Sequence, residues 1–188
     1  MGQTLWFAGR ATGLVSLLLI TATVVLGTSH SGRLTTTGWP RFTLHAVHRN
    51  LSLLTLAFLA VHISTSIIDP YAGIAWPDAV VPFLSTYHPF WLGLGAVAFD
   101  LVVAVILTSL LRTHIPLRVW RGVHLASYAL WPVAVVHGLG IGGSDSTQWW
   151  VIALNGLCAA AVVTSVTRRL LARHPDAQAR RAVEASMR

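Results

Sequence analysis

The chain has 188 residues, of which 54% are apolar and only 10% are charged. This balance excludes an ordinary soluble domain and is typical of an integral membrane protein. All 13 basic residues are arginines, and they lie at the ends of apolar segments and in the C-terminal tail. That distribution indicates membrane topology and argues against nucleic-acid binding. The single cysteine, Cys158, excludes an internal disulfide, a cysteine zinc site and haem attachment through two cysteines.

Five apolar segments are long enough to cross a hydrocarbon layer of about 30 Å, which takes about 20 helical residues. Helices are expected at about residues 5–27, 42–68, 89–111, 117–141 and 149–171, followed by a cytoplasmic tail over 172–188. The first segment lacks the basic start and the cleavage site of a signal peptide, so we expect it to be retained. Residues 69–88 are polar and broken by prolines. We therefore predict an all-α membrane bundle of five transmembrane helices in one domain, 1–188.

The arginines are divided unevenly between the two ends of these helices. Residues 69–88 and 142–148 contain no arginine and hold Asp69, Asp78 and Asp145. The positive-inside rule therefore places the N-terminus outside and the C-terminus in the cytoplasm of a multi-pass protein of the cell membrane. The arginines on the predicted cytoplasmic side are Arg33, Arg41, Arg112, Arg118, Arg121, Arg168, Arg169 and those of the tail.

Four histidines lie inside two of the predicted helices. His48 and His62 belong to 42–68, and His124 and His137 belong to 117–141. A histidine inside a membrane is costly to bury, so it marks a candidate functional site. The two separations, fourteen and thirteen residues, correspond to about 21 and 20 Å of helix rise. We therefore expect His48 beside His124 near the cytoplasm, and His62 beside His137 near the outer side.

One imidazole from each helix at each depth would form two bis-histidine sites. Imidazole is a usual axial ligand of haem iron, and non-covalent haem needs no cysteine. Two alternatives stay open. A metal-ion permease would gather its ligands at one depth, preferably with carboxylates. A structural subunit would use the same histidines only for hydrogen bonds.

The angular positions of the histidines agree with this arrangement on one helix only. His48 and His62 are within about 40° of the same helical face. His124 and His137 are about 140° apart on a straight helix. Pro132 lies between them, and it is expected to bend the axis or change the local twist.

The pattern His-x13-His on one helix and His-x12-His two helices later resembles the transmembrane domain of ferric reductases and NADPH oxidases. The resemblance extends from about Trp6 to Arg169 and implies two b-type haems. It implies that His48 and His124 hold the inner haem and that His62 and His137 hold the outer one. The segments that resemble bacterial ferric-reductase-like proteins are 108–112 (TSLLR), 120–124 (WRGVH), 128–131 (YALW) and 137–139 (HGL).

The resemblance also implies outward electron transfer. The donor would be a cytoplasmic flavoprotein or a quinol, and the acceptor ferric iron, oxygen or a periplasmic protein. The chain contains no recognisable motif for binding a flavin or nicotinamide nucleotide, so we expect a separate electron donor. We expect the electron-transferring haem subunit of a ferric-reductase-type oxidoreductase. The alternative within this class is a haem-binding membrane subunit that serves a periplasmic reductase.

Three arginines are candidate partners of the haem propionates. Arg10 lies near the outer end of the first helix, whereas Arg49 and Arg121 adjoin the predicted inner ligands. Arg10 also matches an arginine of the oxygen-reducing pocket in the oxidases. Ser66 stands where those enzymes carry a histidine one turn beyond the outer ligand, which argues against dedicated superoxide production. The alternative role of Arg10 is contact with lipid headgroups, and that of Arg49 and Arg121 is to set the membrane topology as positive charges on the cytoplasmic side.

Overall fold

The computed structural model describes residues 2–31 and 40–171, and all described secondary structure is helical. Arg33 and the predicted cytoplasmic tail with its arginines lie outside the described residues. Five helical segments are long and apolar enough to cross a membrane, which confirms the predicted all-α membrane bundle. In chain order the elements are α1 (Gly2–Ser31), α2 (Arg41–Ile68), α3 (Trp76–Val80), α4 (Pro89–Leu110), α5 (Leu117–Leu125), α6 (Ser127–Ile141), the 3₁₀ helix η1 (Gly143–Thr147) and α7 (Trp149–Leu171).

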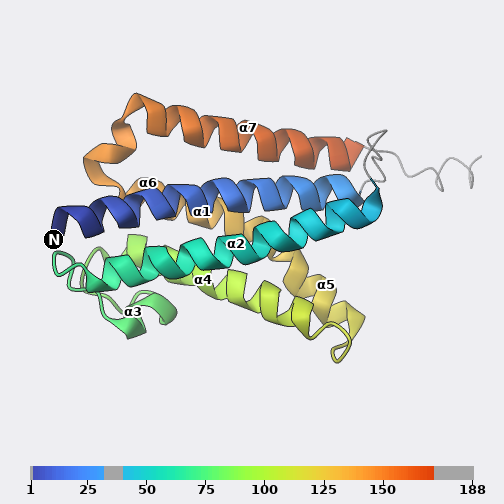
Figure 1. Cartoon of the computed structure of the whole chain (residues 1–188), viewed down its shortest axis with the longest axis horizontal. Coiled ribbons are helices and arrows are strands. Elements are labelled where there is room, and N and C mark those ends of the chain that lie inside the picture. Colours follow the sequence, from blue (N-terminus) through green and yellow to red (C-terminus); the bar gives the residue numbers. More distant parts are fainter. Residues whose placement is uncertain (1, 32–39, 172–188) are drawn as a thin grey trace, which may run out of the picture.

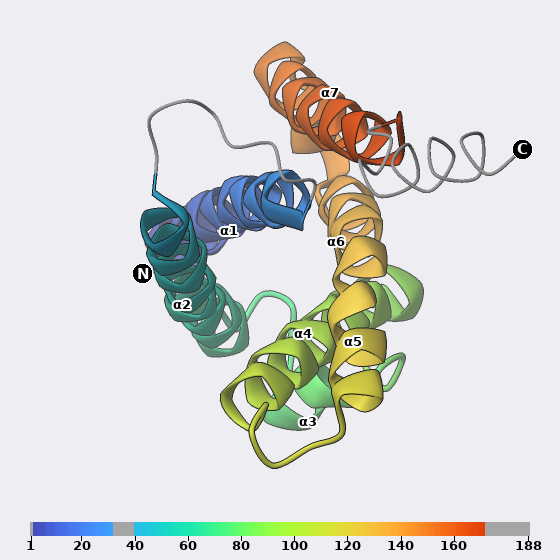
Figure 2. The same cartoon turned by 90° about the vertical axis from the view of Figure 1, so that its right-hand side faces the viewer.

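The long helices run roughly along one axis (Figure 1). Helix α1 packs along α2, helix α4 packs along α6, and α1 also contacts α6 and α7. Seen from one end, α1, α2, α4 and α6 surround the centre of the bundle, and α7 lies outside this ring (Figure 2). The end that carries α3 is here called the outer end, and the end that carries α5 the inner end, after the topology predicted from the arginines. Helix α2 therefore faces α5 and α6 across the centre.

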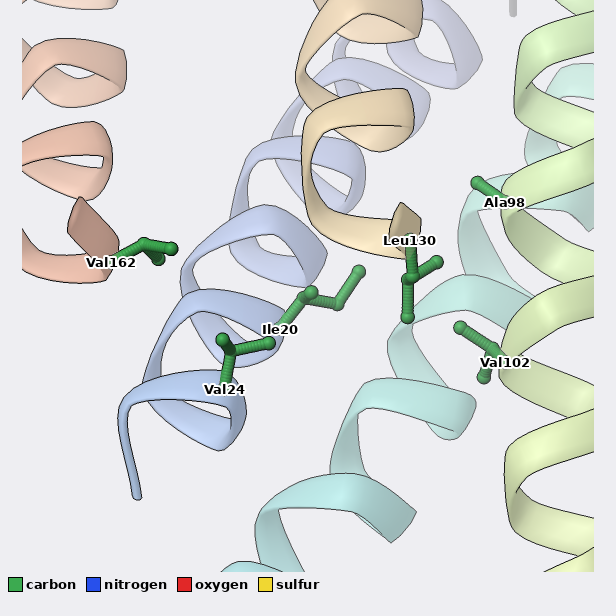
Figure 3. Close-up of a cluster of buried hydrophobic side chains, with 6 residues drawn as sticks. All are labelled: Ile20, Val24, Ala98, Val102, Leu130 and Val162. Carbon is green, nitrogen blue, oxygen red and sulfur yellow. The ribbon is translucent and has the colours of Figure 1, made fainter. Parts of the chain in front are cut away.

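A cluster of buried aliphatic side chains joins four of the helices (Figure 3). Leu130 of α6 lies between His124 and His137 in the sequence, so this apolar layer separates the two histidine levels. The close contacts among these buried side chains stabilise the packing of the helices through dispersion attraction. The members of the cluster are Ile20, Val24, Ala98, Val102, Leu130 and Val162.

The predicted helix over 117–141 is interrupted once. Helix α5 ends at Leu125 and α6 begins at Ser127, with Ala126 between them. The N–H of Ala126 is 3.0 Å from Val123 O and 3.3 Å from Gly122 O, which shows a locally tightened turn. Pro132 lies inside α6, which continues past it. The helical assignment is therefore interrupted at Ala126, whereas it continues through Pro132.

The segment 69–88 forms a folded loop at the outer end. The carboxylate of Asp69 accepts a hydrogen bond from Tyr71 N, and that of Asp78 accepts one from Ala75 N at the start of α3. Phe83 adopts a positive φ of 66° and lies against Gly93 of α4. A Cβ on Gly93 would be 2.2 Å from Phe83 Cδ1, so only glycine lets the loop lie this close to the helix.

Candidate functional site

The structure places the four intramembrane histidines in two facing pairs. The ring centroids of His48 and His124 are 6.5 Å apart, and those of His62 and His137 are also 6.5 Å apart. The interplanar angles are 56° and 80°. The break at Ala126 lies between His124 and His137, and both histidines face α2 despite their angular mismatch on a straight helix.

These separations fit one metal ion between the two members of each pair. Two imidazoles with one nitrogen each about 2 Å from a shared metal have ring centroids about 6.3 Å apart. Among the described residues, no three His, Cys, Asp or Glu side chains gather into a metal site. Each pair therefore offers two protein ligands, which is the number that axial haem ligation requires. The geometry fits haem better than a metal ion held by protein ligands alone.

Both histidines of the outer pair have a fixed tautomer. His62 Nδ1 is 2.7 Å from the carbonyl oxygen of Gly9, and His137 Nδ1 is 2.8 Å from that of Trp91. A carbonyl oxygen only accepts, so each Nδ1 carries the hydrogen and donates it. The remaining ring nitrogen, Nε2, then holds a free lone pair, as a metal ligand requires.

The inner pair is held differently. The imidazole of His124 stacks on Trp120 with centroids 5.0 Å apart and an interplanar angle of 22°. The guanidinium of Arg112 lies 4.7 Å from the centre of the same indole. His124 Nδ1 and Trp120 Nε1 are buried and have no hydrogen-bond partner among the described residues. The indole Nε1 of Trp120 can only donate, and a buried donor is costly unless an acceptor lies beside it; the carboxylates of a haem would supply one.

The contact between Trp120 and His124 was not predicted from the sequence. The signal was available, because residues four apart on a helix are neighbours on its surface. The contact of Arg112 with the same indole could not be predicted from the sequence. Arg112 follows α4 and reaches Trp120 across the connection between two helices, and only the fold brings the two together.

A cavity of about 530 Å³ surrounds the outer pair and extends toward the outer end. Helices α1, α2, α4, α6 and α7 and the segment 69–88 all contribute to its wall. The loop at the outer end therefore borders the same space as the outer histidines. The polar and charged lining residues include Arg10, His62, Ser66, Asp69, Tyr71, Asp78, Tyr87, His137, Asp145 and Asn155.

Arg10 lines this cavity and also ties α1 to the end of α6. Its Nη2 atom donates to Ile141 O at 3.3 Å and to Gly142 O at 3.1 Å. Its Nε is 3.8 Å from a carboxylate oxygen of Asp145, and its guanidinium lies 5.3 Å from the centre of the Trp6 ring. These contacts were not foreseen from the sequence, because the acceptors are backbone carbonyls more than 130 residues away.

The two other predicted arginines lie beside the inner pair and are exposed. Arg49 follows His48 on α2, and Arg121 precedes His124 on α5 by three residues. A further contact at this end joins Arg169 of α7 to the hydroxyl of Tyr128 on α6. Tyr128 is one turn after His124, so α7 is attached to the helix segment that follows this histidine.

Comparison with curated proteins and with solved structures gives no match. Residues 12–135, well over half of the chain, match the family described as ferric reductase like transmembrane component. The matched range includes His48, His62 and His124 and ends two residues before His137. This family is in general haem-binding and works in transmembrane electron transfer. The chain therefore belongs to the ferric reductase-like transmembrane family and is a multi-pass membrane protein.

Proposed function

We propose that the protein carries electrons across the cell membrane through two b-type haems. One would be held by His48 and His124, and the other by His62 and His137. The observation that carries the proposal is the equal 6.5 Å separation of the two facing imidazole pairs, one at each end of the bundle. A bis-histidine haem supplies reversible one-electron chemistry, and the protein sets its position and surroundings.

The chain's own residues would perform three tasks. The carbonyls of Gly9 and Trp91 keep Nε2 of the outer histidines available as a ligand. The buried aliphatic cluster excludes water between the two levels. Trp131 packs against that cluster, and its Nε1 donates to Thr21 Oγ1 at 2.9 Å. An indole held in the layer between the haems would shorten the gap that electrons must cross.

The charges at the two ends support outward transfer. Three aspartates line the outer cavity, and Arg10 offsets only part of their charge. This environment favours a cationic acceptor such as ferric iron; oxygen is the other small acceptor considered. The electron donor, a cytoplasmic flavoprotein or a quinol, would act at the arginine-rich inner end. Among the residues that the structure describes, the exposed arginines at this end are Arg49, Arg112, Arg118, Arg121 and Arg168.

The three arginines predicted from the sequence are proposed as propionate partners. Arg10 reaches the outer cavity, and only part of its guanidinium is used by the carbonyls of α6. Arg49 and Arg121 adjoin the inner histidines, where the unpartnered Nε1 of Trp120 adds a further donor. Charge-assisted hydrogen bonds from these groups would hold carboxylates in place.

A periplasmic reductase as partner is the second candidate, and the exposed aromatic residues of the outer loop favour it. Tyr71 is 81% exposed and Trp76 is 63% exposed, although both are large aromatic side chains. Tyrosine and tryptophan are enriched in protein–protein interfaces. In this variant of the proposal the outer haem would reduce or oxidise a protein instead of a small acceptor.

The decisive test is a dithionite-reduced minus oxidised spectrum of the purified protein, with the ratio of haem to protein. The proposal requires a b-type α-band and two haems per chain. Absence of the band would refute haem binding. One haem per chain would remove one of the two pairs, and metal flux without haem absorbance would identify a permease.

A further inference from the structure

His62 lies against α1 at a place where that helix has no side chain. Its Nδ1 donates to Gly9 O at 2.7 Å. One turn further along α1, a Cβ built on Gly13 would lie 3.0 Å from His62 Cε1 and 3.1 Å from its Nδ1. These distances are shorter than ordinary van der Waals contact. A side chain at position 13 would therefore require the imidazole or the helix that carries it to shift by a few tenths of an ångström.

The same arrangement recurs at the facing histidine. His137 Nδ1 donates to Trp91 O at 2.8 Å. Gly95 is again one turn further along α4, and a Cβ there would lie 2.5 Å from His137 Cε1 and 2.7 Å from Nδ1. Each outer imidazole thus meets a carbonyl at one position of the neighbouring helix and a glycine four residues later.

A third glycine extends the pattern to the inner pair. A Cβ on Gly27 of α1 would lie 3.3 Å from His48 Cε1. Gly13 and Gly27 are fourteen residues apart, and so are His62 and His48. Because α1 and α2 are antiparallel neighbours (Figure 1), α1 presents one glycine to each histidine of α2. The equal spacing on both helices is what keeps the two contacts in register.

We infer that Gly13, Gly27 and Gly95 are positioning residues for three of the four imidazoles. Their lack of a Cβ lets each ring lie on the backbone of the neighbouring helix, which sets the direction of Nε2 toward the facing histidine. This inference rests on the proposed function, because the purpose of that direction is to bind haem iron. His124 follows a different scheme, since it stacks on Trp120 of its own helix.

Three single substitutions to alanine test the inference, each purified in the same detergent. Gly13→Ala and Gly95→Ala act on the outer pair, and Gly27→Ala acts on the inner pair. Gly156→Ala is the matched control, because it lies in the transmembrane helix α7 and a Cβ there meets nothing within 4 Å. The measurements are haem-to-protein ratio, redox titration and low-temperature electron paramagnetic resonance of the oxidised protein, which reports imidazole orientation for each haem.

Gly13→Ala and Gly95→Ala should both alter the electron paramagnetic resonance signal of the outer haem. Gly27→Ala should alter the signal of the inner haem. Disturbing a residue that orients a metal ligand typically lowers affinity about tenfold to a hundredfold. We expect a loss of that order for the haem that is altered, with the largest effect for Gly95→Ala. Gly156→Ala should retain both wild-type signals.

The possible failures are distinguishable. A wild-type protein without haem overturns the proposed function. A wild-type protein with two haems whose signals are unchanged in the Gly13→Ala and Gly27→Ala variants overturns the positioning role alone. A change in both signals for each variant also overturns it, because the contacts are specific to one level. If Gly95→Ala does not fold, the two milder variants decide the outcome.

Discussion

Trp131 of α6 donates a hydrogen bond from its indole nitrogen to the Thr21 hydroxyl of α1, at 2.9 Å. The same hydroxyl donates to Leu17 O at 2.7 Å, so it is used as both donor and acceptor. Thr21 is buried, and its bond to Trp131 joins two helices that also share the aliphatic cluster. The bond therefore fixes the indole in the layer between the two histidine pairs.

Removing this bond should destabilise the bundle without removing haem. Trp131→Phe keeps an aromatic ring but loses the donor, and Thr21→Val loses the acceptor. A net contribution of about 1 kcal/mol is expected for such a hydrogen bond. Chemical unfolding of both single variants and the double variant would show a coupling energy of that size. Strictly additive losses would mean that the bond contributes nothing.

Each histidine of α2 should control a different haem. If the protein binds two haems as proposed, His62→Ala and His48→Ala are each expected to lower the content from two haems per chain to one, because each removes one of the two imidazoles of a pair. The haem that remains should differ in its spectrum and midpoint potential between the two variants. His45→Ala is the matched control, since His45 is an exposed histidine on the same helix. Loss of both haems in one variant would show that the sites are not independent.

The transmembrane segments could be predicted because they depend on apolar length. The span from Phe42 to Ile68 and the one from Trp149 to Leu171 have the expected bounds. A hydrocarbon layer of about 30 Å requires a certain number of helical residues whatever the neighbouring helices do. The histidine spacing was equally visible, because the rise of a helix converts residue number directly into depth.

The break at Ala126 could not be predicted in the same way. Alanine has the highest intrinsic helix propensity, and no glycine or proline stands next to it. Pro132 was the obvious candidate from local chemistry, yet α6 continues through it. The contacts of Arg10 were hidden for a related reason. Its carbonyl acceptors, Ile141 and Gly142, lie within reach only because the end of α6 packs beside α1 in the folded chain. A local sequence pattern cannot show which distant segments lie side by side.

The hydrogen bonds of Arg10 should contribute more to the stability of the protein than its ion pair does. Arg10→Lys keeps the charge but cannot reproduce the two hydrogen bonds to the end of α6. We expect it to lower the free energy of unfolding by about 1–3 kcal/mol. Asp145→Asn removes only an ion pair 3.8 Å long between side chains that are about one third exposed. Solvent screening limits such a pair to roughly 0–1 kcal/mol.

Thermal unfolding at low and high salt would separate these two contributions. The effect of Asp145→Asn should shrink as salt rises, and that of Arg10→Lys should persist. A larger loss for Asp145→Asn than for Arg10→Lys would contradict this ranking. Redox titration adds a second measurement. Arg10→Lys should shift the midpoint potential of the outer haem if Arg10 contacts a propionate of that haem.

The stack of Arg112, Trp120 and His124 should act on the inner haem alone. Trp120→Leu removes a ring that lies 5.0 Å from the imidazole, together with the face on which Arg112 rests. Aromatic pairs contribute about 0.5–1.5 kcal/mol beyond their buried area, so up to roughly tenfold weaker binding of the inner haem is expected. The outer haem should keep its spectrum and its midpoint potential.

Trp149→Leu provides the control for this variant, because Trp149 is 78% exposed at the start of α7. It removes an indole of the same size at the opposite end of the bundle, so it reports the general effect of losing an interfacial tryptophan. Arg112→Gln then separates the two layers of the stack. It should weaken binding of the inner haem less than Trp120→Leu does, because the indole still packs on His124. An equal loss in both variants would indicate that the guanidinium, and not the ring contact, orients the histidine.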